Sequence, residues 1–308
     1  MNKKRIFQIV ILIILIAWFG VYLHQHLEEF QQLKIANFFY AIPLGMLFIC
    51  LLINNGLIVK YLLEPFEITL KFKEWFGLSV ITSLGNYLTP FRGGAIARAV
   101  YLKKIHQFSY SHFLSTLAGI YIVIFLVYSL FGLSAMTLLN YYYGIFNALI
   151  FVFFLGLFLF LLAIIVFSPE IKKTKYSFIN KCIEVINGWH LVKSNKKVLF
   201  ATTLITIINV VIMVLMMLLE FKIFGVNIGL LNILFLSIIS TFGSFISITP
   251  GALGIKEAIV AFTATVINLP ISQVLAVSIL DRAVGLAIIF ILGPIFSYLL
   301  MNQKNDKI

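Results

Sequence analysis

Uncharged apolar runs about as long as a bilayer is thick constrain the fold of this chain more than any other sequence feature. Residues 39–59 and 145–167, for example, contain no Asp, Glu, Lys or Arg. A transmembrane helix needs about 20 consecutive apolar residues, and a helix satisfies its own backbone hydrogen bonds in lipid. The whole chain is 62% hydrophobic and 11% charged, which is typical of polytopic membrane proteins. We therefore expect an all-α polytopic membrane protein that forms a single integral domain over residues 1–308.

The apolar runs predict about six full spans together with two interrupted regions. The spans are expected at residues 6–23, 39–59, 112–133, 145–167, 199–219 and 272–301. Residues 6–23 follow a basic N-terminus, as the apolar core of a secretory signal does, but no small-residue cleavage site comes after them. This first run is therefore predicted to be an uncleaved span. Loops are expected at residues 60–75, 134–144, 168–198 and 220–229.

The basic residues are distributed between the apolar runs. The chain has a formal net charge of +12, and its Lys and Arg side chains gather near residues 3–5, 103–104, 172–197 and 304–307. Cytoplasmic loops of membrane proteins carry such an excess, so both termini are predicted to be cytoplasmic and the protein to lie in the cell inner (plasma) membrane. This placement argues against nucleic acid as a partner. The sequence also predicts no metal site and no cofactor.

Two apolar regions are interrupted by stretches with the same pattern, Thr-Pro-x-x-x-Gly. One stretch covers residues 89–94 and the other residues 249–254. Thr is a good N-cap, and Pro suits the first position of a helix because the N–H that it lacks has no partner there. Each stretch therefore predicts a helix start inside an apolar region. The alternative for either stretch is a kinked membrane helix that binds nothing.

The flanking charges predict that both interrupted regions are re-entrant helical hairpins. Residues 76–104 begin and end near basic loops, so this hairpin is expected to enter from the cytoplasm. Counting back from a cytoplasmic C-terminus, we expect residues 230–267 to enter from the outer face. The chain then divides into two halves, about 1–167 and 199–308, joined by a cytoplasmic linker at 168–198. Opposite hairpins in the two halves form an inverted repeat, which is common in secondary transporters.

The returning half of each hairpin is expected to place a helix N-terminus near the middle of the bilayer, where its N–H groups attract anions. Glycines at each break leave those N–H groups uncovered, so that an anion is able to approach closely. Ionisable side chains in the same regions are site candidates because each is costly inside a membrane. The residues expected to line a substrate site are Asn86, Thr89, Pro90, Arg92, Gly93, Gly94, Arg98, Thr249, Pro250, Gly251, Gly254, Lys256, Glu257, Asp281 and Arg282.

Some of these charges also have structural explanations. Arg98 is close enough to a basic cluster to extend its side chain to the cytoplasmic surface. Glu257 and Asp281 are each next to a basic residue and are able to form structural ion pairs. Arg92 and Arg282 are the strongest candidates for phosphate contact, because a guanidinium group matches two phosphate oxygens at once.

The same residues resemble the signatures of a known membrane family. The first signature reads Asn86-x-x-Thr89-Pro90-x-Arg92-x-Gly94-x-x-x-Arg98, and the second reads Pro250-Gly251-x-Leu253-Gly254-x-Lys256-Glu257-Ala258. Both are similar to motifs of the lysylphosphatidylglycerol synthase transmembrane region, or flippase-like, family, and the similarity covers nearly the whole chain. Ala252 and Lys256 are mild departures from the second motif. Ala95 stands where the first motif commonly has an acidic residue.

The hairpin architecture and the resemblance both imply a membrane lipid flippase or transporter. Its substrate is expected to be a lipid with an anionic or polar headgroup, such as an aminoacylated phospholipid or a polyprenyl-phosphate-linked glycan. Family members that synthesise aminoacyl lipids carry a large soluble domain, whereas only residues 301–308 follow the last predicted span. The chain is therefore not expected to be an enzyme. The alternatives are a non-transporting membrane partner of a separate lipid-modifying enzyme or glycosyltransferase, and a remnant of an aminoacyl-phosphatidylglycerol synthase.

Overall fold

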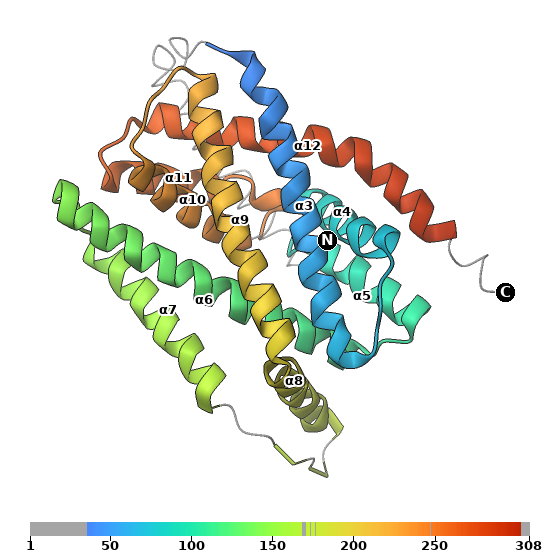
Figure 1. Cartoon of the computed structure of the whole chain (residues 1–308). Helices are drawn as coiled ribbons and strands as arrows, with labels where there is room; N and C mark the ends of the chain where they lie inside the picture. The colour runs from blue at the N-terminus through green and yellow to red at the C-terminus, as the bar shows by residue number, and fades with distance from the viewer. Residues whose placement is uncertain (1–35, 168–170, 173, 176, 247, 303–308) are drawn as a thin grey trace, which may run out of the picture.

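The computed structural model describes residues 36–302 except 168–170, 173, 176 and 247, and these residues form helices without a β-strand (Figure 1). The helices are α3 (Ala41–Leu63), α4 (Phe72–Leu88), α5 (Gly93–His106), α6 (Tyr110–Tyr143), α7 (Ala148–Phe167), α8 (Ser177–Ser194), α9 (Lys196–Ile223), α10 (Leu230–Phe245), α11 (Ile255–Val266) and α12 (Ile271–Asn302). Short 3-10 turns are η1 (Phe38–Tyr40), η2 (Glu64–Phe66) and η3 (Pro250–Ala252). The predicted span at 6–23 lies outside the described residues.

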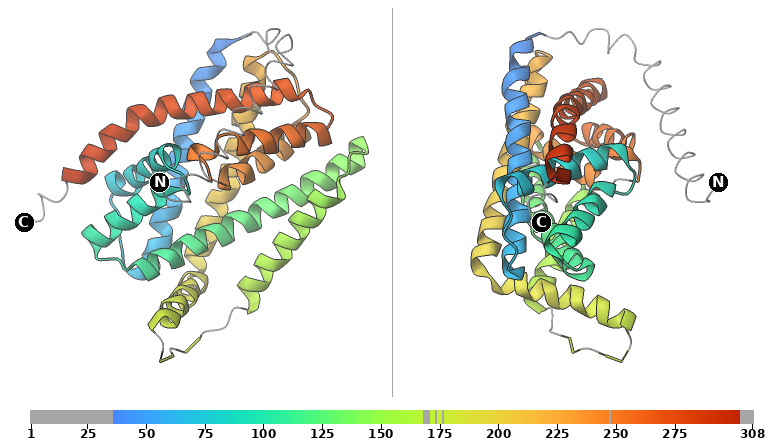
Figure 2. Two further views of the ribbon diagram at one scale, coloured as in Figure 1. Left: turned by 180° about the vertical axis from the view of Figure 1, so that it is seen from behind. Right: turned by 90° about the vertical axis from the view of Figure 1, so that its right-hand side faces the viewer.

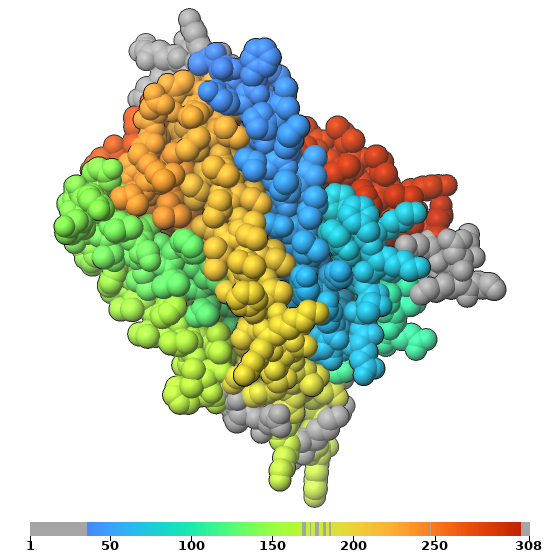
Figure 3. Space-filling model, viewed as in Figure 1, coloured from blue at the N-terminus to red at the C-terminus, as the bar shows by residue number. Residues whose placement is uncertain are grey.

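Five described helical segments are long and apolar enough to cross a membrane. They are Phe38–Phe66, Tyr110–Tyr143, Ala148–Phe167, Lys196–Ile223 and Ile271–Asn302. These segments coincide with the second to sixth predicted spans, so the structure supports a multi-pass membrane protein. Helix α7 has many exposed large apolar side chains, including Leu149, Phe160 and Phe167, and it lies with α6 along one edge of the molecule (Figure 3). Such a surface suits contact with lipid.

The prediction of a loop at residues 134–144 is wrong, because α6 continues as far as Tyr143. No helix breaker interrupts this segment before Gly144, which has a left-handed backbone with φ 67. Ala135, Met136 and Leu139 are completely buried, which shows that the extra turns pack against the rest of the protein. Their burial stabilises the helix beyond the predicted end of the span.

The loop predicted at residues 168–198 is also wrong in part, because it contains α8. This helix buries Ile183, Trp189 and Val192 and packs against α6. The polar residues of α8 make it less apolar than a membrane span, and its burial is partial, because Ile179, Ile186 and Leu191 are exposed. Helices α3 and α4 likewise extend into the predicted loop at residues 60–75.

The helices pack in pairs that follow the order of the chain only in part. Neighbours in sequence pair in α4 with α5, α6 with α7 and α10 with α11, whereas α3 pairs with α9 from the other half of the chain. Figures 1 and 2 show α3 and α9 side by side, with α12 crossing near them. Helix α12 packs against both α4 and α11, and it therefore links the two interrupted regions.

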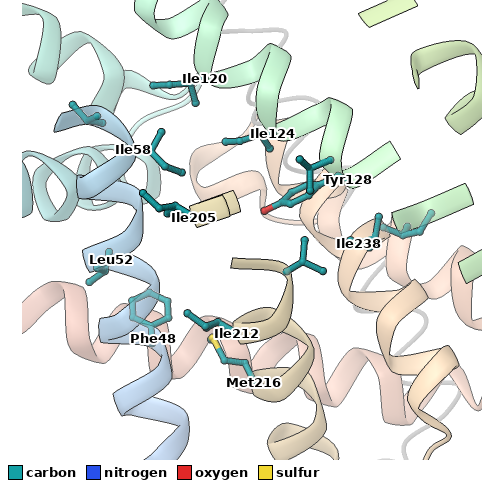
Figure 4. Close-up of a cluster of buried hydrophobic side chains, with 14 of the residues drawn as sticks. Phe48, Leu52, Ile58, Ile120, Ile124, Tyr128, Ile205, Ile212, Met216 and Ile238 are labelled. Carbon is teal, nitrogen blue, oxygen red and sulfur yellow. The ribbon is translucent and has the colours of Figure 1, made fainter. Parts of the chain in front are cut away.

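The core lies where α3, α6, α9 and α10 meet (Figure 4). Phe48 of α3, Ile124 of α6 and Ile212 of α9 are among its buried side chains. Amides also connect α3 to α9: Asn54 Nδ2 donates to Asn209 Oδ1 at 3.0 Å, and Asn209 Nδ2 donates to Asn55 Oδ1 at 3.3 Å. These hydrogen bonds between α3 and the buried Asn209 favour one register of the two helices.

Candidate functional site

The first break separates α4 from α5 and differs from its predicted form. Thr89 follows the last residue of α4, and its hydroxyl donates to the Gly85 carbonyl at 2.5 Å. Phe91 and Arg92 then adopt left-handed backbone conformations, with φ 53 and 55. These two residues cannot continue a right-handed helix. Helix α5 therefore begins at Gly93, and Thr89 ends a helix where the sequence predicted that it would begin one.

Glycine at this break permits close packing of α4 against α5. A Cβ atom on Gly94 would overlap the Thr82 carbonyl of α4, and one on Gly85 would overlap the Gly94 backbone. The Gly94 N–H donates to Asn86 Oδ1 at 3.2 Å. The expectation that this glycine leaves its N–H uncovered for an anion is therefore wrong: a side chain of α4 already accepts from it.

The second break separates α10 from α11. It begins with η3 at Thr249-Pro250, as predicted, but α11 starts only at Ile255. Gly254 has φ 81, and its N–H donates to Glu257 Oε2 at 2.7 Å. An acidic side chain near a helix N-terminus satisfies N–H groups and interacts favourably with the helix dipole. The Glu257 carboxylate therefore lies at the helix N-terminus where the sequence predicts a bound anion.

Two ion pairs connect α11 to α12. Lys256 Nζ pairs with Asp281 Oδ2, and Arg282 Nη2 pairs with Glu257 Oε1 at 2.7 Å. Arg282 Nη1 also donates to the Gly251 carbonyl at 2.9 Å. Each acid thus pairs across the helix interface with the base of the other helix, because adjacent residues of one helix point in different directions. The structural ion-pair alternative holds for these four side chains.

Arg92 and Arg98 have different surroundings. Among the described residues, no carboxylate forms an ion pair with either of them. Arg92 Nη1 donates to the Tyr121 hydroxyl at 3.1 Å, and its guanidinium carbon lies 4.2 Å from the centroid of the Phe245 ring. Arg98 is 7% exposed and lies 5.4 Å from the centroid of the Phe113 ring. Its burial contradicts the alternative in which it extends to the surface.

Two cavities whose walls carry polar and charged side chains adjoin at the first break. The central cavity, of about 260 Å³, has apolar walls as well, and its polar and charged lining residues include Asn55, Ser83, Asn86, Tyr87, Arg92, Glu220, Lys256, Asp281 and Arg282. The arginine cavity, of about 180 Å³, is lined on its polar side by Asn55, Ser79, Thr82, Ser83, Asn86, Arg92 and Arg98. Asn55, Ser83, Asn86 and Arg92 belong to both sets. Arg92 therefore lies between the ion pairs of the second break and the buried Arg98.

An apolar groove adjoins the arginine cavity on its other side. This lateral groove, of about 630 Å³, is lined by Phe91, Arg92, Ala95, Ile96, Ala99, Tyr110, Phe113, Leu114, Leu117, Tyr121, Phe245, Ile246 and Ile248. Phe91, Ile96 and Leu114 are exposed, so the groove lies at the molecular surface. Arg92 is the charged residue of its wall and faces both a polar and an apolar space.

The structure sorts the predicted site residues into two groups. Those that line the cavities are Asn86, Arg92, Arg98, Gly251, Lys256, Asp281 and Arg282. Those that do not line these three spaces are Thr89, Pro90, Gly93, Gly94, Thr249, Pro250, Gly254 and Glu257. The second group sets the backbone path and the helix contacts at the breaks. The breaks also touch each other, since a Cβ on Gly251 would lie 2.9 Å from the Tyr87 ring.

The sequence does not predict Glu220 as a site residue. Residues 220–229 are expected to form a loop, but Glu220 belongs to α9, is 2% exposed and lines the central cavity. The apolar run before it ends at Leu219, which made the acid look like the start of a loop. A signal was present, because Phe221 and Ile223 continue the apolar pattern past the charge, and both are buried.

A comparison with family models identifies the chain. The model described as the lysylphosphatidylglycerol synthase TM region matches residues 5–293. The chain belongs to this family. The resemblance seen in the two motifs is thereby confirmed, and membership implies a membrane protein related to lipid modification or transport. No curated protein and no solved structure matches the chain significantly.

Proposed function

We propose that the chain is a lipid flippase or transporter that moves a lipid with an anionic headgroup across the cell membrane. The observation that carries this proposal is the position of Arg92, which borders two cavities with polar and charged side chains and an apolar groove. A membrane lipid joins a charged headgroup to an apolar tail, so its transporter needs a polar site open to an apolar one. The lateral groove would receive the tail while Arg92 holds the headgroup.

The headgroup class follows from the charges. Arg92 and Arg98 line one small cavity, and the described carboxylates neutralise neither of them by an ion pair. A phosphate would supply the missing negative charge and accept from both guanidinium groups. Arg282 is a weaker candidate than the sequence indicated, because Glu257 and the Gly251 carbonyl already accept from it. Aminoacylated phospholipids and polyprenyl-phosphate lipids both provide such a phosphate.

The two helix–break–helix units support a transport architecture. Their helices α4, α5, α10 and α11 have 17, 14, 16 and 12 residues, and at about 1.5 Å per residue none is long enough to cross a bilayer comfortably. We propose that each unit is a re-entrant hairpin with its break near mid-membrane, and that the two enter from opposite faces as an inverted repeat. Rocking of one repeat against the other would alternate access to Arg92.

Labelling of single cysteines tests this topology. Lys103, Lys175, Asn227 and Asn268 are all exposed, so a cysteine at each position is accessible to reagents. In intact cells, positions 103 and 175 are expected to react only with a reagent that enters the cytoplasm, and positions 227 and 268 with one that does not. If positions 103 and 227 react from the same side, the inverted repeat is wrong.

Reconstituted transport tests the function. The purified protein is placed in vesicles that contain acyl-labelled phosphatidylglycerol or lysyl-phosphatidylglycerol, and the fraction of probe accessible to a membrane-impermeant quencher is followed over time. Arg92→Lys keeps the charge but loses the forked contact, so transport is expected to fall about tenfold. Arg92→Ala removes charge-assisted hydrogen bonds and should reduce transport about a hundredfold. Lys104→Ala, at an exposed lysine of α5, the helix that follows Arg92, is the matched control.

The same experiment separates transport from the alternative function. A wild-type protein that moves neither probe, yet co-purifies with a lipid-modifying enzyme or glycosyltransferase, would favour the non-transporting partner. Normal transport in Arg92→Ala would remove Arg92 from the site. We also expect no aminoacyl transfer by the chain itself, which is measured with labelled aminoacyl-tRNA and phosphatidylglycerol.

A further inference from the structure

Glu220 has no role in the headgroup site just described. Glu220 is 2% exposed, lies on the long helix α9 and lines the central cavity. Among the described residues, no hydrogen-bond donor reaches its buried Oε1 atom. Asp281 of α12 lines the same cavity. A buried carboxyl oxygen that accepts no hydrogen bond is poorly stabilised as an anion, and a bound proton removes its charge.

The charged and titratable groups around Glu220 come from several helices. Helix α12 contributes Asp281 and Arg282, α11 contributes Lys256, α4 contributes Tyr87, and the turn before α5 contributes Arg92. Glu257 of α11 is linked to this set through Arg282. Helices α3 and α10 contribute uncharged polar side chains, among them Asn55, Ser237, Ser240 and Thr241. On α9 itself, Lys222 is exposed and lies over the ring of Tyr40.

Among the described residues, no cation forms an ion pair with Glu220. Lys256 pairs with Asp281 and Arg282 with Glu257, and Arg92 lies against Tyr121 and Phe245. An ionised Glu220 would therefore be a buried negative charge without an ion-pair partner, which costs several kcal/mol. A proton taken from water removes that charge.

We propose that Glu220 is a proton-binding site, and that binding and release of its proton is coupled to the transport of the anionic lipid. Release of the proton adds a negative charge to the wall of the central cavity. That charge would repel a phosphate held by Arg92 on the wall of the same cavity. Proton binding therefore favours anion binding, and the anion favours proton binding by the same factor. The coupling rests on the proposed function, whereas the proton site does not.

Infrared spectroscopy of the purified protein in lipid bilayers tests the proton site directly. A protonated carboxyl group has a carbonyl stretch that an ionised carboxylate lacks. At neutral pH exposed carboxyl groups are ionised, so the wild type is expected to retain one such band. Glu220→Gln should abolish the band, and Glu220→Asp should keep it at a shifted frequency. Glu67→Gln, at an exposed acid remote from the cavity, should leave it unchanged. The proton site is overturned if the wild type lacks the band, or if Glu220→Gln retains it.

Transport in a pH gradient tests the coupling. Vesicles with wild-type protein and acyl-labelled phosphatidylglycerol are expected to move the probe several-fold faster in the direction of proton flow than without a gradient. Glu220→Gln should move it at a rate that does not respond to the gradient. Wild-type transport that is active but insensitive to the gradient overturns the coupling. If the infrared band is present and the wild type moves no lipid probe, the proposed function fails while the proton site stands.

Discussion

The two breaks share a sequence pattern but differ in how their charges are neutralised. At the second break, Lys256 and Glu257 pair with Asp281 and Arg282 of α12. At the first break, Arg92 lies against aromatic rings, and none of the described carboxylates forms an ion pair with it. One break is therefore internally neutral, and the other presents a cation to the cavities.

This difference shows why a shared motif does not imply a shared role. Both breaks use glycine and proline to interrupt a helix, which is a local property of the backbone. Whether the charged side chains form ion pairs depends on which helix packs against each break. The ion pairs at the second break hold α11 to α12, whereas Arg92 at the first break contacts Tyr121 and Phe245 and is the cation that we propose to bind an anion. Four predictions test the comparison, from the largest expected change in stability to the smallest.

Removal of Arg282 should have the largest effect on stability. Arg282→Ala leaves Glu257 buried without its cation, and such a loss typically destabilises a protein by about 3–5 kcal/mol. We expect the yield of folded protein after detergent extraction to collapse. Glu257→Gln combined with Arg282→Gln removes both charges and should restore much of the yield. Yield and thermal unfolding of the single and double variants are the measurements, and a stable Arg282→Ala protein would show that the second break is not held by this pair.

A side chain at Gly94 should have the next largest effect. The Cβ of Gly94→Ala would meet the backbone of Thr82, which cannot move away as a flexible side chain would, so the substitution should cost about 1–3 kcal/mol. Gly251→Ala places a Cβ at φ 58 and should cost about 1–2 kcal/mol. Gly156→Ala, where the Cβ meets nothing within 4 Å, is the control. Thermal unfolding compares the three, and a Gly94→Ala protein as stable as Gly156→Ala would contradict the close packing of α4 against α5.

The opposite ends of α4 and α5 are joined by Glu74. Its Oε1 atom accepts from His106 Nε2 at 2.8 Å and from the Tyr101 hydroxyl at 3.0 Å, and its Oε2 atom accepts from the Lys71 N–H at 2.9 Å. Burial by itself raises the pKa of Glu74, but the hydrogen bonds from His106, Lys71 and Tyr101 outweigh it and hold the pKa at about 2, below the ordinary 4.5. A depressed pKa stabilises the folded state above pH 4.5, and this contribution is lost as the pH falls towards 2.

The prediction for this cluster concerns acid stability. Unfolding temperature should fall between pH 4.5 and 2 in the wild type, and Glu74→Gln should remove that part of the pH dependence. At neutral pH the substitution should cost about 1–1.5 kcal/mol, because a charge-assisted hydrogen bond becomes a neutral one. Glu67→Gln, at an exposed acid of the preceding turn, should keep the wild-type profile. An unchanged profile in Glu74→Gln would show that Glu74 does not join the two helices.

Removal of Arg92 should have the smallest effect on stability, although we expect it to reduce transport about a hundredfold. Arg92→Ala leaves no ion-paired carboxylate behind and loses contacts with Phe245 and Tyr121, which should cost about 1 kcal/mol. The unfolding temperature and yield should therefore stay near those of the wild type, in contrast to Arg282→Ala. A collapse in yield comparable to that of Arg282→Ala would show that both breaks are structural, and the comparison would fail.

The sequence alone determined the apolar helices and the two breaks. Length and hydropathy are sufficient to locate a membrane-length helix, because lipid requires each span to satisfy its own backbone. Gly and Pro likewise mark the breaks, since their effects act on the backbone near them. The sequence did not determine where every helix ends. Helix α6 extends to Tyr143 because its last turns are buried against other helices, and burial of that kind does not follow from the local sequence.

Only the tertiary structure decided the partners of the charges. Lys256 pairs with Asp281 and Glu257 with Arg282, each over 25 residues of sequence, and the same sequence also allowed other pairings. Glu220 enters the cavity because α9 continues one turn beyond the apolar run and packs beside α12. Ion pairing and burial depend on which helices become neighbours, and that choice is made by the packing of the whole chain rather than by residues close in sequence.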